Sequence, residues 1–316
     1  MRAPAFGADR PRLYQEMLRI CAWADEIGFA TVRISEHHGV EDGYLPAPLI
    51  AAAAIAARTR RMRLSIAAIP LPFHDPVLIA EQIAILDHIS EGRVDLTLAA
   101  GYVPSEFRMF GVSPSERAKR MEDGIALLRQ CWTGERFTHA GRDIRVTPHP
   151  LQQPHPPLFI GGSVPAAAKR AARLNVGFDS HLPDLYAIYR EAALAHGHTP
   201  SPWVQCGPTF LHVTEDPDAA WERIAPHAIH ETNAYGQWAV ETGLDSSYRP
   251  VDSADALRAT GAYAVLTPEQ TIALGNELGD EGMLLFHPLL AGLDPDFSWQ
   301  SLHLLEHAVL PKLRAR

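Results

Sequence analysis

The sequence predicts an α/β protein whose parallel strands form a (β/α)8 TIM barrel with insertions. Short apolar strands alternate along the chain with helices of roughly 12 to 18 residues, the pattern of right-handed βαβ units. An open doubly wound sheet has the same alternation but usually carries a Gly-rich phosphate turn, and the sequence contains neither G-x-G-x-x-G nor a P-loop. The 316 residues also suit a barrel of about 250 residues with additional loops.

The first half of the chain supplies the first strands and helices. Apolar residues recur at helical spacing from Leu13 to Ile27, and Gly28 ends the run. Pro76 is well placed to open a helix, because proline suits the first turn. The other segments expected here are a strand at "ATVRIS", a buried helix from Pro46 to Thr59, a strand from Met62 to Ile69, a strand from Arg93 to Ala100, and a helix marked by Met121, Ile125, Leu128 and Trp132.

The alternation continues after the Pro-rich link "TPHPLQQPHPP". No change of composition marks a domain boundary, so we predict a single domain over residues 1–316. The expected segments are a strand at "LFI", a helix at "AAAKRAARL", a strand at "VGFDS", a helix at "LYAIYREAALAHG", a strand at "WVQCGPTFLHV", a helix at "DPDAAWERIAPHAI", a final strand at "EGMLLFH", and a closing helix at "WQSLHLLEHAVLPKL".

The composition excludes several functional classes. The net charge of -9 argues against a nucleic-acid partner, which usually requires a basic face. No apolar run approaches the roughly 18 residues of a membrane span, and the N-terminal stretch has no apolar signal region. The three cysteines are far apart, which argues against a disulfide framework or a zinc knuckle. We therefore expect a reduced, cytoplasmic protein that binds neither nucleic acid nor membranes.

The stretch "VRISEHHGVEDGY" places Glu36, His37 and His38 where a predicted strand ends, the usual location of barrel chemistry. Adjacent strand residues point to opposite sides, so His37 and His38 are poorly placed to bind one metal ion, and we predict no metal site. A histidine can serve as an acid or base because its ordinary pKa lies near 6.5. We favour this role for His37, whereas for His38 simple packing against a loop is an equal alternative.

Two further strand ends are candidate binding elements. In "LFIGGSVPAAAKRAAR", Gly161, Gly162 and Ser163 lead directly into a helix, whose N-terminus can bind phosphate through free N–H groups. The alternative is that Ser163 only caps the helix. Small residues at Ala67 and Ala68 leave room for a flat ligand, although an ordinary core layer explains their spacing better. Asp95, within a buried strand, needs a partner for its charge.

Together these motifs resemble the bacterial-luciferase-like superfamily of flavin- or deazaflavin-dependent oxidoreductases. The resemblance extends over nearly the whole chain from about Leu13 and is specific for the superfamily but not for a substrate. The matching stretches, in the family's order, are "GFATVRISEHHGVEDGYLPAPL", "RLSIAAIPLPFHDPVLIAEQIAILDHISEGRVDLTLAAGY", "EFRMFGVSPSERAKRMEDGIALLRQCWTGE", "PHPPLFIGGSVPAAAKRAARL" and "FHPLLAGLDPDFSWQSLHLLEHAVLPKL".

The resemblance implies a TIM barrel that binds FMN or coenzyme F420. In this family reduced FMN often comes from a separate reductase and reacts with O2. His37 matches an acid–base histidine. The pair Ala67–Ala68 matches the strand end that supports the isoalloxazine ring, often through a non-prolyl cis peptide bond. The segment from Gly161 to Ser163 matches the one that receives the cofactor phosphate.

The chain departs from the family pattern in two places. Ala99 and Ala100 stand where luciferases have a reactive cysteine and a phosphate-binding arginine, so phosphate binding would depend on backbone groups and on Arg117 or Lys169. The family's first strand is also short or missing, because "RAPAFGA" resembles the segment that follows it. Residues 2–6 filling the gap, a second subunit covering it, and a natural start further upstream are three explanations, of which we favour the last.

We therefore expect a luciferase-like FMN-dependent monooxygenase that uses reduced FMN and O2 to oxidise a small organic substrate. We expect it to be a homodimer supplied by a separate flavin reductase. One alternative is an F420-dependent oxidoreductase that transfers hydride without O2. Another is a non-catalytic flavin-binding relative, since shortened members of this superfamily exist. The sequence does not specify the substrate.

Overall fold

The computed structural model describes residues 1–243 and 248–314, which divide into two compact units. Unit 1 contains residues 1–17, 41–43 and those described from 202 onwards. Unit 2 contains residues 18–40 and 44–201. The first helix, α1 (Arg10–Ile27), contributes to both units and ends just before Gly28, as predicted. That residues 1–316 form a single domain stays a prediction.

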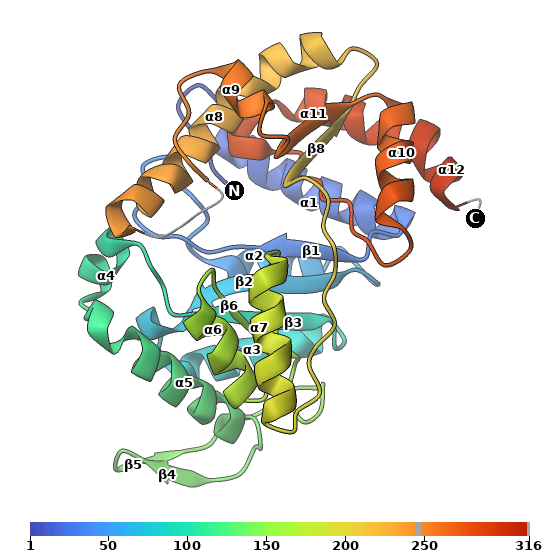
Figure 1. Ribbon diagram of the computed structural model, residues 1–316. Helices are drawn as coiled ribbons and strands as arrows, with labels where there is room; N and C mark the ends of the chain where they lie inside the picture. Colours follow the sequence, from blue (N-terminus) through green and yellow to red (C-terminus); the bar gives the residue numbers. More distant parts are fainter. Residues whose placement is uncertain (244–247, 315–316) are drawn as a thin grey trace. The chain divides into compact units, whose positions relative to one another are not determined.

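Unit 2 alternates strands with helices, which confirms the predicted α/β pattern (Figure 1). Eight α-helices of the described chain, in both units, begin at a proline, a position where the missing N–H costs no hydrogen bond. The elements of unit 2 after α1 are β1 (Thr31–Ile34), α2 (Pro48–Ala56), β2 (Arg63–Pro70), the 3-10 helix η1 (Leu71–Phe73), α3 (Pro76–Ile89), β3 (Val94–Ala99), α4 (Pro104–Phe110), η2 (Pro114–Glu116), α5 (Arg117–Cys131), β4 (Phe137–His139), β5 (Arg142–Ile144), β6 (Leu158–Gly161), α6 (Pro165–Arg173), β7 (Gly177–Asp179) and α7 (Pro183–Ala195).

A five-stranded parallel sheet forms the centre of unit 2, in the order β1-β2-β3-β6-β7. The short antiparallel pair β4–β5 is separate from it and was not predicted. The sheet's outer face is apolar, and Leu64, Ile66 and Leu96 are fully buried. Because all five strands run the same way, their carboxyl ends share one edge. The loops that carry the candidate residues therefore start from that edge.

The sheet of unit 2 is strongly curved. In a flat sheet, β1 and β7 would lie about 19 Å apart, four strand spacings of about 4.8 Å. Instead, the Arg33 guanidinium on β1 contacts the Asp179 carboxylate on β7, with Nη2 2.8 Å from Oδ2. The Thr97 hydroxyl on β3 donates to the same carboxylate at 2.8 Å. Side chains from both edges and the middle thus meet on the concave face, which is the curvature that a barrel requires.

A second ion pair lies on the concave face, nearer the amino ends of the strands. The Asp95 carboxylate on β3 accepts hydrogen bonds from Arg63 Nε at 2.6 Å and Nη2 at 2.7 Å. The partner required for this buried-strand charge is therefore present. The Asp95 carboxylate also raises the pKa of Arg63, although burial acts in the opposite direction.

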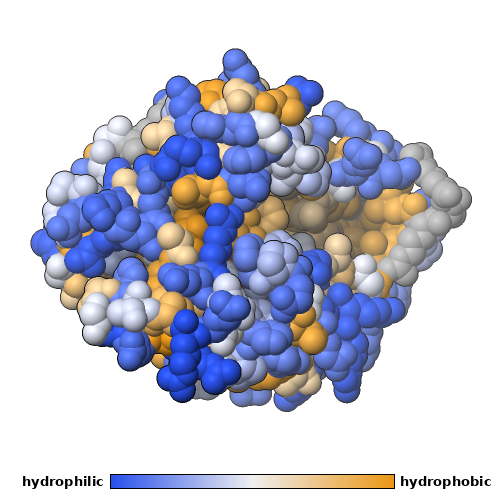
Figure 2. All heavy atoms as spheres, turned by 90° about the horizontal axis from the view of Figure 1, so that it is seen from below, coloured by the Kyte–Doolittle hydropathy of each residue, from blue (hydrophilic) through white to orange (hydrophobic). Residues whose placement is uncertain are grey.

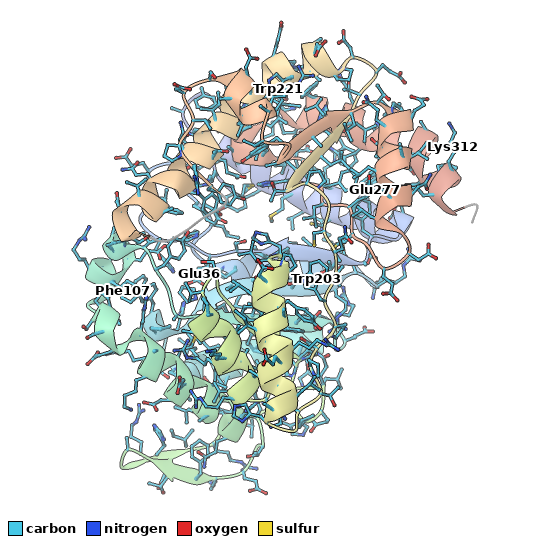
Figure 3. The ribbon with its side chains drawn as sticks, viewed as in Figure 1. Glu36, Phe107, Trp203, Trp221, Glu277 and Lys312 are labelled. Carbon is cyan, nitrogen blue, oxygen red and sulfur yellow. The ribbon has the colours of Figure 1, made fainter. Side chains whose placement is uncertain are left out.

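Unit 1 contains a smaller parallel sheet made of β8 and β9. Its apolar core lies around Trp221 on α8, labelled in Figure 3, and includes Phe210, Ile224 and Tyr263. The elements are β8 (Phe210–Val213), α8 (Pro217–Thr242), α9 (Ala254–Arg258), β9 (Tyr263–Leu266), α10 (Pro268–Leu278), η3 (Leu290–Gly292), α11 (Pro295–Leu304), a π-helical turn η4 (Leu305–Val309) and α12 (Leu310–Arg314).

Two expectations for unit 1 need correction, and one of the alternatives left open for the N-terminus is contradicted. The segment "EGMLLFH" is not a strand: it makes one parallel bridge, between Cys206 and Met283, and does not extend beyond it. The partner of β8 is instead β9, which the sequence reading missed. Residues 2–6 form no strand either, although the Ala3 N–H donates to the Asp42 carbonyl at 2.8 Å.

The described chain offers no helix long and apolar enough to cross a membrane. Figure 2 shows mostly hydrophilic side chains on the face drawn, with hydrophobic ones between them. Some exposed large apolar side chains occur singly along the chain, for example Ile50, Leu194 and Val240, whereas Met109 and Phe110 are adjacent on α4. Scattered residues of this kind are normal on a folded surface.

The three cysteines should differ sharply in reactivity. Burial raises the pKa of Cys21 to about 12 and that of Cys131 to about 11, so both thiols remain protonated at pH 8. Cys206 is partly exposed. Since the thiolate is the nucleophile, an aromatic disulfide reagent should label the folded chain mainly at Cys206 and all three thiols after denaturation. Rapid labelling of all three in the folded chain would show that α1 and α5 open readily.

Candidate functional site

The predicted site residues of unit 2 gather at the carboxyl edge of its sheet. Glu36, His37 and His38 follow β1, and Ala67 and Ala68 lie near the end of β2. Gly161 ends β6, with Gly162 and Ser163 immediately after it. These segments are distant in sequence, and the parallel strand order brings them to one edge. This edge is where ligands of α/β proteins usually bind.

His37 is held in place by a carboxylate from α4. Its Nδ1 lies 2.9 Å from Oε1 of Glu106, whose side chain is only 2% exposed. The same Oε1 accepts the backbone N–H of His38 at 2.9 Å. The rings of Tyr44 and Tyr102 meet the His37 ring edge-on, with centroids 4.9 and 5.8 Å away. An ionised carboxylate only accepts, so the pair places the proton on Nδ1 and makes Nε2 the acceptor.

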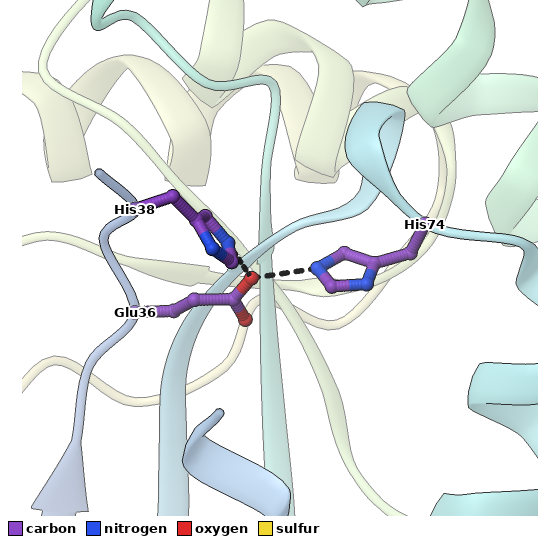
Figure 4. A group of neighbouring side chains, drawn as sticks. All are labelled: Glu36, His38 and His74. Atoms are coloured by element: carbon purple, nitrogen blue, oxygen red, sulfur yellow. Dashed lines mark hydrogen bonds and ion pairs between the residues drawn. The ribbon is translucent and has the colours of Figure 1, made fainter. Parts of the chain in front are cut away.

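His38 points to the other side and joins a different carboxylate. Oε1 of Glu36 lies 2.6 Å from Nε2 of His38 and 2.6 Å from Nε2 of His74, which follows η1 (Figure 4). The expectation that the adjacent histidines diverge is therefore confirmed. Burial acts most strongly on Glu36 and by itself raises its pKa, but the two histidines together outweigh it and leave the pKa lowered.

The ends of β2 and β6 come within van der Waals reach of each other. The Ala67–Ala68 peptide bond is cis, as the resemblance implied. Ala67 pairs with Thr97 and Ile69 with Leu98, so Ala68 is an extra residue in the ladder. A Cβ atom placed on Gly161 would lie 3.1 Å from Cγ2 of Thr97 and 3.8 Å from Cβ of Ala68. Small residues thus keep the backbone accessible here.

The segment after β6 differs in detail from the expectation. The N-cap of α6 is Val164, and no side chain caps this helix, so the reading of Ser163 as its cap is wrong. Gly162 is exposed, and a Cβ there would come within 2.6 Å of the Ala167 Cβ. Arg117 donates to the Gly101 carbonyl at 3.2 Å, and Lys169 is exposed on α6. Roles for Ser163, Arg117 and Lys169 in phosphate binding stay predictions.

Two residues of this edge were not assigned a role from the sequence. Glu106 belongs to α4, a helix that the pattern reading did not identify, and lies beside the buried Phe107 labelled in Figure 3. His74 lies in "PFHDP", directly before Asp75, which caps α3 by accepting from the Val77 N–H. The sequence indicates these two residues only by their position, because each follows the carboxyl end of a predicted strand.

Comparison with known proteins identifies the family. The family model described as "Luciferase-like monooxygenase" matches residues 4–277, most of the chain. The chain belongs to this family. Its fold agrees: the monooxygenase RslO1 from Streptomyces bottropensis superimposes with a TM-score of 0.80 at 25% identity, covering 98% of this chain and 96% of that one. The prediction of a luciferase-like TIM-barrel α/β fold is therefore confirmed.

The names of the curated relatives point to more than one cofactor. The oxygenase component of a flavin-dependent trigonelline monooxygenase from Acinetobacter baylyi is 30% identical over 161 residues, 49% of this chain and 44% of that protein. An FMNH(2)-dependent dimethylsulfone monooxygenase from Pseudomonas putida is 29% identical over 187 residues, covering 55% and 51%. An F420-dependent glucose-6-phosphate dehydrogenase from Nakamurella multipartita is 32% identical over 196 residues, covering 58% and 57%. The chain spans about half the length of these relatives.

Proposed function

We propose that the chain is the oxygenase of a flavin-dependent monooxygenase that uses reduced FMN and O2 to oxidise a small organic molecule. The observation that carries the proposal is the joint position of the His37–Glu106 pair and the small residues at the ends of β2 and β6 on one sheet edge. The likeness to an FMNH(2)-dependent relative and to an oxygenase component supports it. A separate flavin reductase, a homodimer and a cytoplasmic location belong to the same proposal.

The residues present suit a flavin. Ala67 and Ala68 would lie against the ring, because they offer backbone and methyl groups without bulk. Gly161, Gly162 and Ser163 would receive the phosphate at the start of α6, where backbone N–H groups point away from the helix. When reduced and bound, FMN supplies the electrons that activate O2.

The chain's own part in the reaction is to position groups and move a proton. Glu106 holds the His37 ring by Nδ1, so Nε2 is the atom that would take up or release a proton beside the ligand. The edge-on rings of Tyr44 and Tyr102 restrict the rotation of His37. The surrounding side chains also keep water from the reacting groups, since only 12% of the His37 side chain is exposed.

The second candidate is an F420-dependent oxidoreductase that transfers hydride without O2. It is favoured by the 32% identity to an F420-dependent dehydrogenase. Both candidates place the cofactor at the same sheet edge. They differ in which cofactor binds more tightly and in whether O2 is consumed.

Replacing Gly161 by valine should weaken cofactor binding. The new side chain would start 3.1 Å from Thr97 and 3.8 Å from Ala68, and would fill the space between β2 and β6. Overpacking costs about 1 to 3 kcal/mol, so we expect roughly 5- to 150-fold weaker binding. Calorimetric titration under anaerobic conditions with reduced FMN, and separately with F420, measures this.

The control for this variant is Ala195→Val, at the exposed end of α7. Gly162→Leu is a less specific test, because its Cβ would collide with Ala167 and displace α6 itself. Unchanged affinity of Gly161→Val for both cofactors would place the site elsewhere. Tighter binding of F420 than of reduced FMN by the natural chain would favour the second candidate.

A further inference from the structure

A compact group of three metal-ligating side chains lies next to the proposed flavin site. Glu36 and His38 come from the loop after β1, and His74 comes from the loop after η1 at the end of β2. Adjacent parallel strands bring the two loops together. One ligand atom from each residue lies within 4.8 Å of the others. Figure 4 shows one Glu36 oxygen between the two imidazole rings.

Half of the Glu36 carboxylate has no partner. Its side chain is 1% exposed, and both histidines contact Oε1. Oε2 is buried and has no hydrogen bond among the described residues. Within that part of the chain, Glu36 also makes no ion pair with arginine or lysine. A buried carboxylate oxygen normally has a hydrogen bond or a cation beside it, so this site is incomplete.

The charge of the site favours a cation. Glu36 is the acidic member of the group, and among the described residues its Oε1 contacts only the two imidazole nitrogens, which a cation could bridge to the carboxylate. His37 does not contact the Glu36 carboxylate, because its ring is hydrogen-bonded to Glu106 on the opposite side of the chain.

The donor set identifies the class of cation. Two imidazole nitrogens and one carboxylate oxygen suit divalent transition metals such as Zn²⁺ or Fe²⁺, whereas Ca²⁺ and Mg²⁺ prefer oxygen ligands alone. Metal–ligand distances of about 2.0 to 2.2 Å separate neighbouring ligand atoms by about 3.0 Å at right angles and about 3.4 Å in a tetrahedral site. The two contacts of 2.6 Å would therefore widen by about 0.4 to 0.8 Å.

Both imidazoles are able to supply Nε2 to a metal ion. Coordination requires an unprotonated Nε2, with the proton on Nδ1. No other hydrogen bond within the described part of the chain fixes the tautomer of His38 or His74. The Phe110 ring packs edge-on against His38 at 4.7 Å and stacks on Phe73 at 5.1 Å, so one side of the site is apolar.

We propose that Glu36, His38 and His74 bind one divalent transition-metal ion, with coordination positions left open for solvent or a small ligand. The site goes beyond the proposed function, which requires no metal. It would join the loops after β1 and β2 at the edge where the flavin is proposed to lie. The proposal differs from our expectation of no metal site, which considered His37 with His38 and not His74.

The test uses the full chain after removal of metals with a chelator. Calorimetric titration with Zn²⁺ should show one tight site per chain, and saturating Zn²⁺ should raise the Tm. Co²⁺ should give visible absorption bands of a low-symmetry site. His74→Gln, at the most exposed of the three ligands, should lower Zn²⁺ affinity by more than the roughly 10- to 100-fold typical of losing an outer-shell partner. Glu36→Gln should have at least the same effect.

The matched control is His303→Gln, because His303 is exposed and its ring lies 6.4 Å from that of His307. The chain has 16 histidines, so weak additional zinc binding is expected in the natural chain and in this variant, and the variant should keep the tight site. The absence of a tight site in the natural chain would overturn the proposal. Undiminished tight binding by His74→Gln and Glu36→Gln would do the same. If both variants fail to fold, the natural chain still provides the test. A Zn²⁺ titration of the natural chain that shows no one-to-one site, together with an unchanged Tm, would overturn the proposal.

Discussion

His37→Ala is expected to lower kcat with reduced FMN by roughly 10² to 10⁴-fold while leaving flavin affinity little changed. The reason is that the Glu106 carboxylate holds Nδ1 and presents Nε2 at the sheet edge where the flavin is proposed to bind. Alanine removes the proton-transferring atom but no part of the β2 or β6 backbone. Steady-state turnover with a reductase partner, combined with anaerobic titration of reduced FMN, separates the two effects.

Two companion variants make this result specific. Glu106→Gln keeps the size of the side chain but weakens the hold on Nδ1, so kcat should fall less than in His37→Ala. His38→Ala should affect stability more than turnover, because His38 is buried against Glu36 and Phe110. The reverse pattern, with His38→Ala inactive and His37→Ala active, would mean that the proton-transferring histidine is His38.

Acidification from pH 7 to pH 4 should lower the free energy of unfolding of unit 1 by about 3 kcal/mol because of His212 alone. This side chain is buried on β8 and stacks on Phe297, with centroids 4.5 Å apart. Burial, assisted by the nearby Arg223 charge, lowers the pKa of His212 to about 4. The unfolded chain binds this proton near pH 6.5, whereas the folded chain does so only near pH 4. The stability is therefore complete above pH 6.5 and is lost as the pH falls towards 4.

Urea unfolding followed between pH 7 and pH 4 measures this loss. His212→Leu should reduce the slope of stability against pH in this window, since leucine has no proton to bind. His303→Gln, on the surface of α11, should keep the slope of the natural chain. An equal slope in His212→Leu would mean that the buried ring is protonated without opening the core.

The strand and helix pattern could be predicted where a single local signal is sufficient. The run from Leu13 to Ile27 is periodic and ends at a glycine, and α1 also ends at Ile27, although it begins earlier, at Arg10. "EGMLLFH" failed because an apolar run becomes a strand only if another strand pairs with it, and its single bridge is to Cys206. The pairing of β8 with β9 depends on how α8 and the segment after it bring the chain back beside β8. Local sequence does not encode this path.

The sequence predicted which strand ends carry the candidate site residues, but not which side chains contact one another there. The ends of β1, β2 and β6 were predicted, and the parallel strand order places them at one edge. Which carboxylate each histidine contacts was not predictable. Glu106 is 69 residues from His37, and His74 is 38 residues from Glu36. Such contacts depend on the exact path of two loops and on α4.

Ala68 is an extra residue in β2 that takes no part in the pairing with β3. Ala67 opposes Thr97 and Ile69 opposes Leu98, so the ladder on β3 continues without a place for Ala68. Ala68 therefore adds a methyl group that a Cβ built on Gly161 would meet at 3.8 Å, without taking a place in the ladder. Under the proposed function, one added residue, rather than a change of side chain, would supply the surface for the flavin, while the strand on either side of it stays paired to β3.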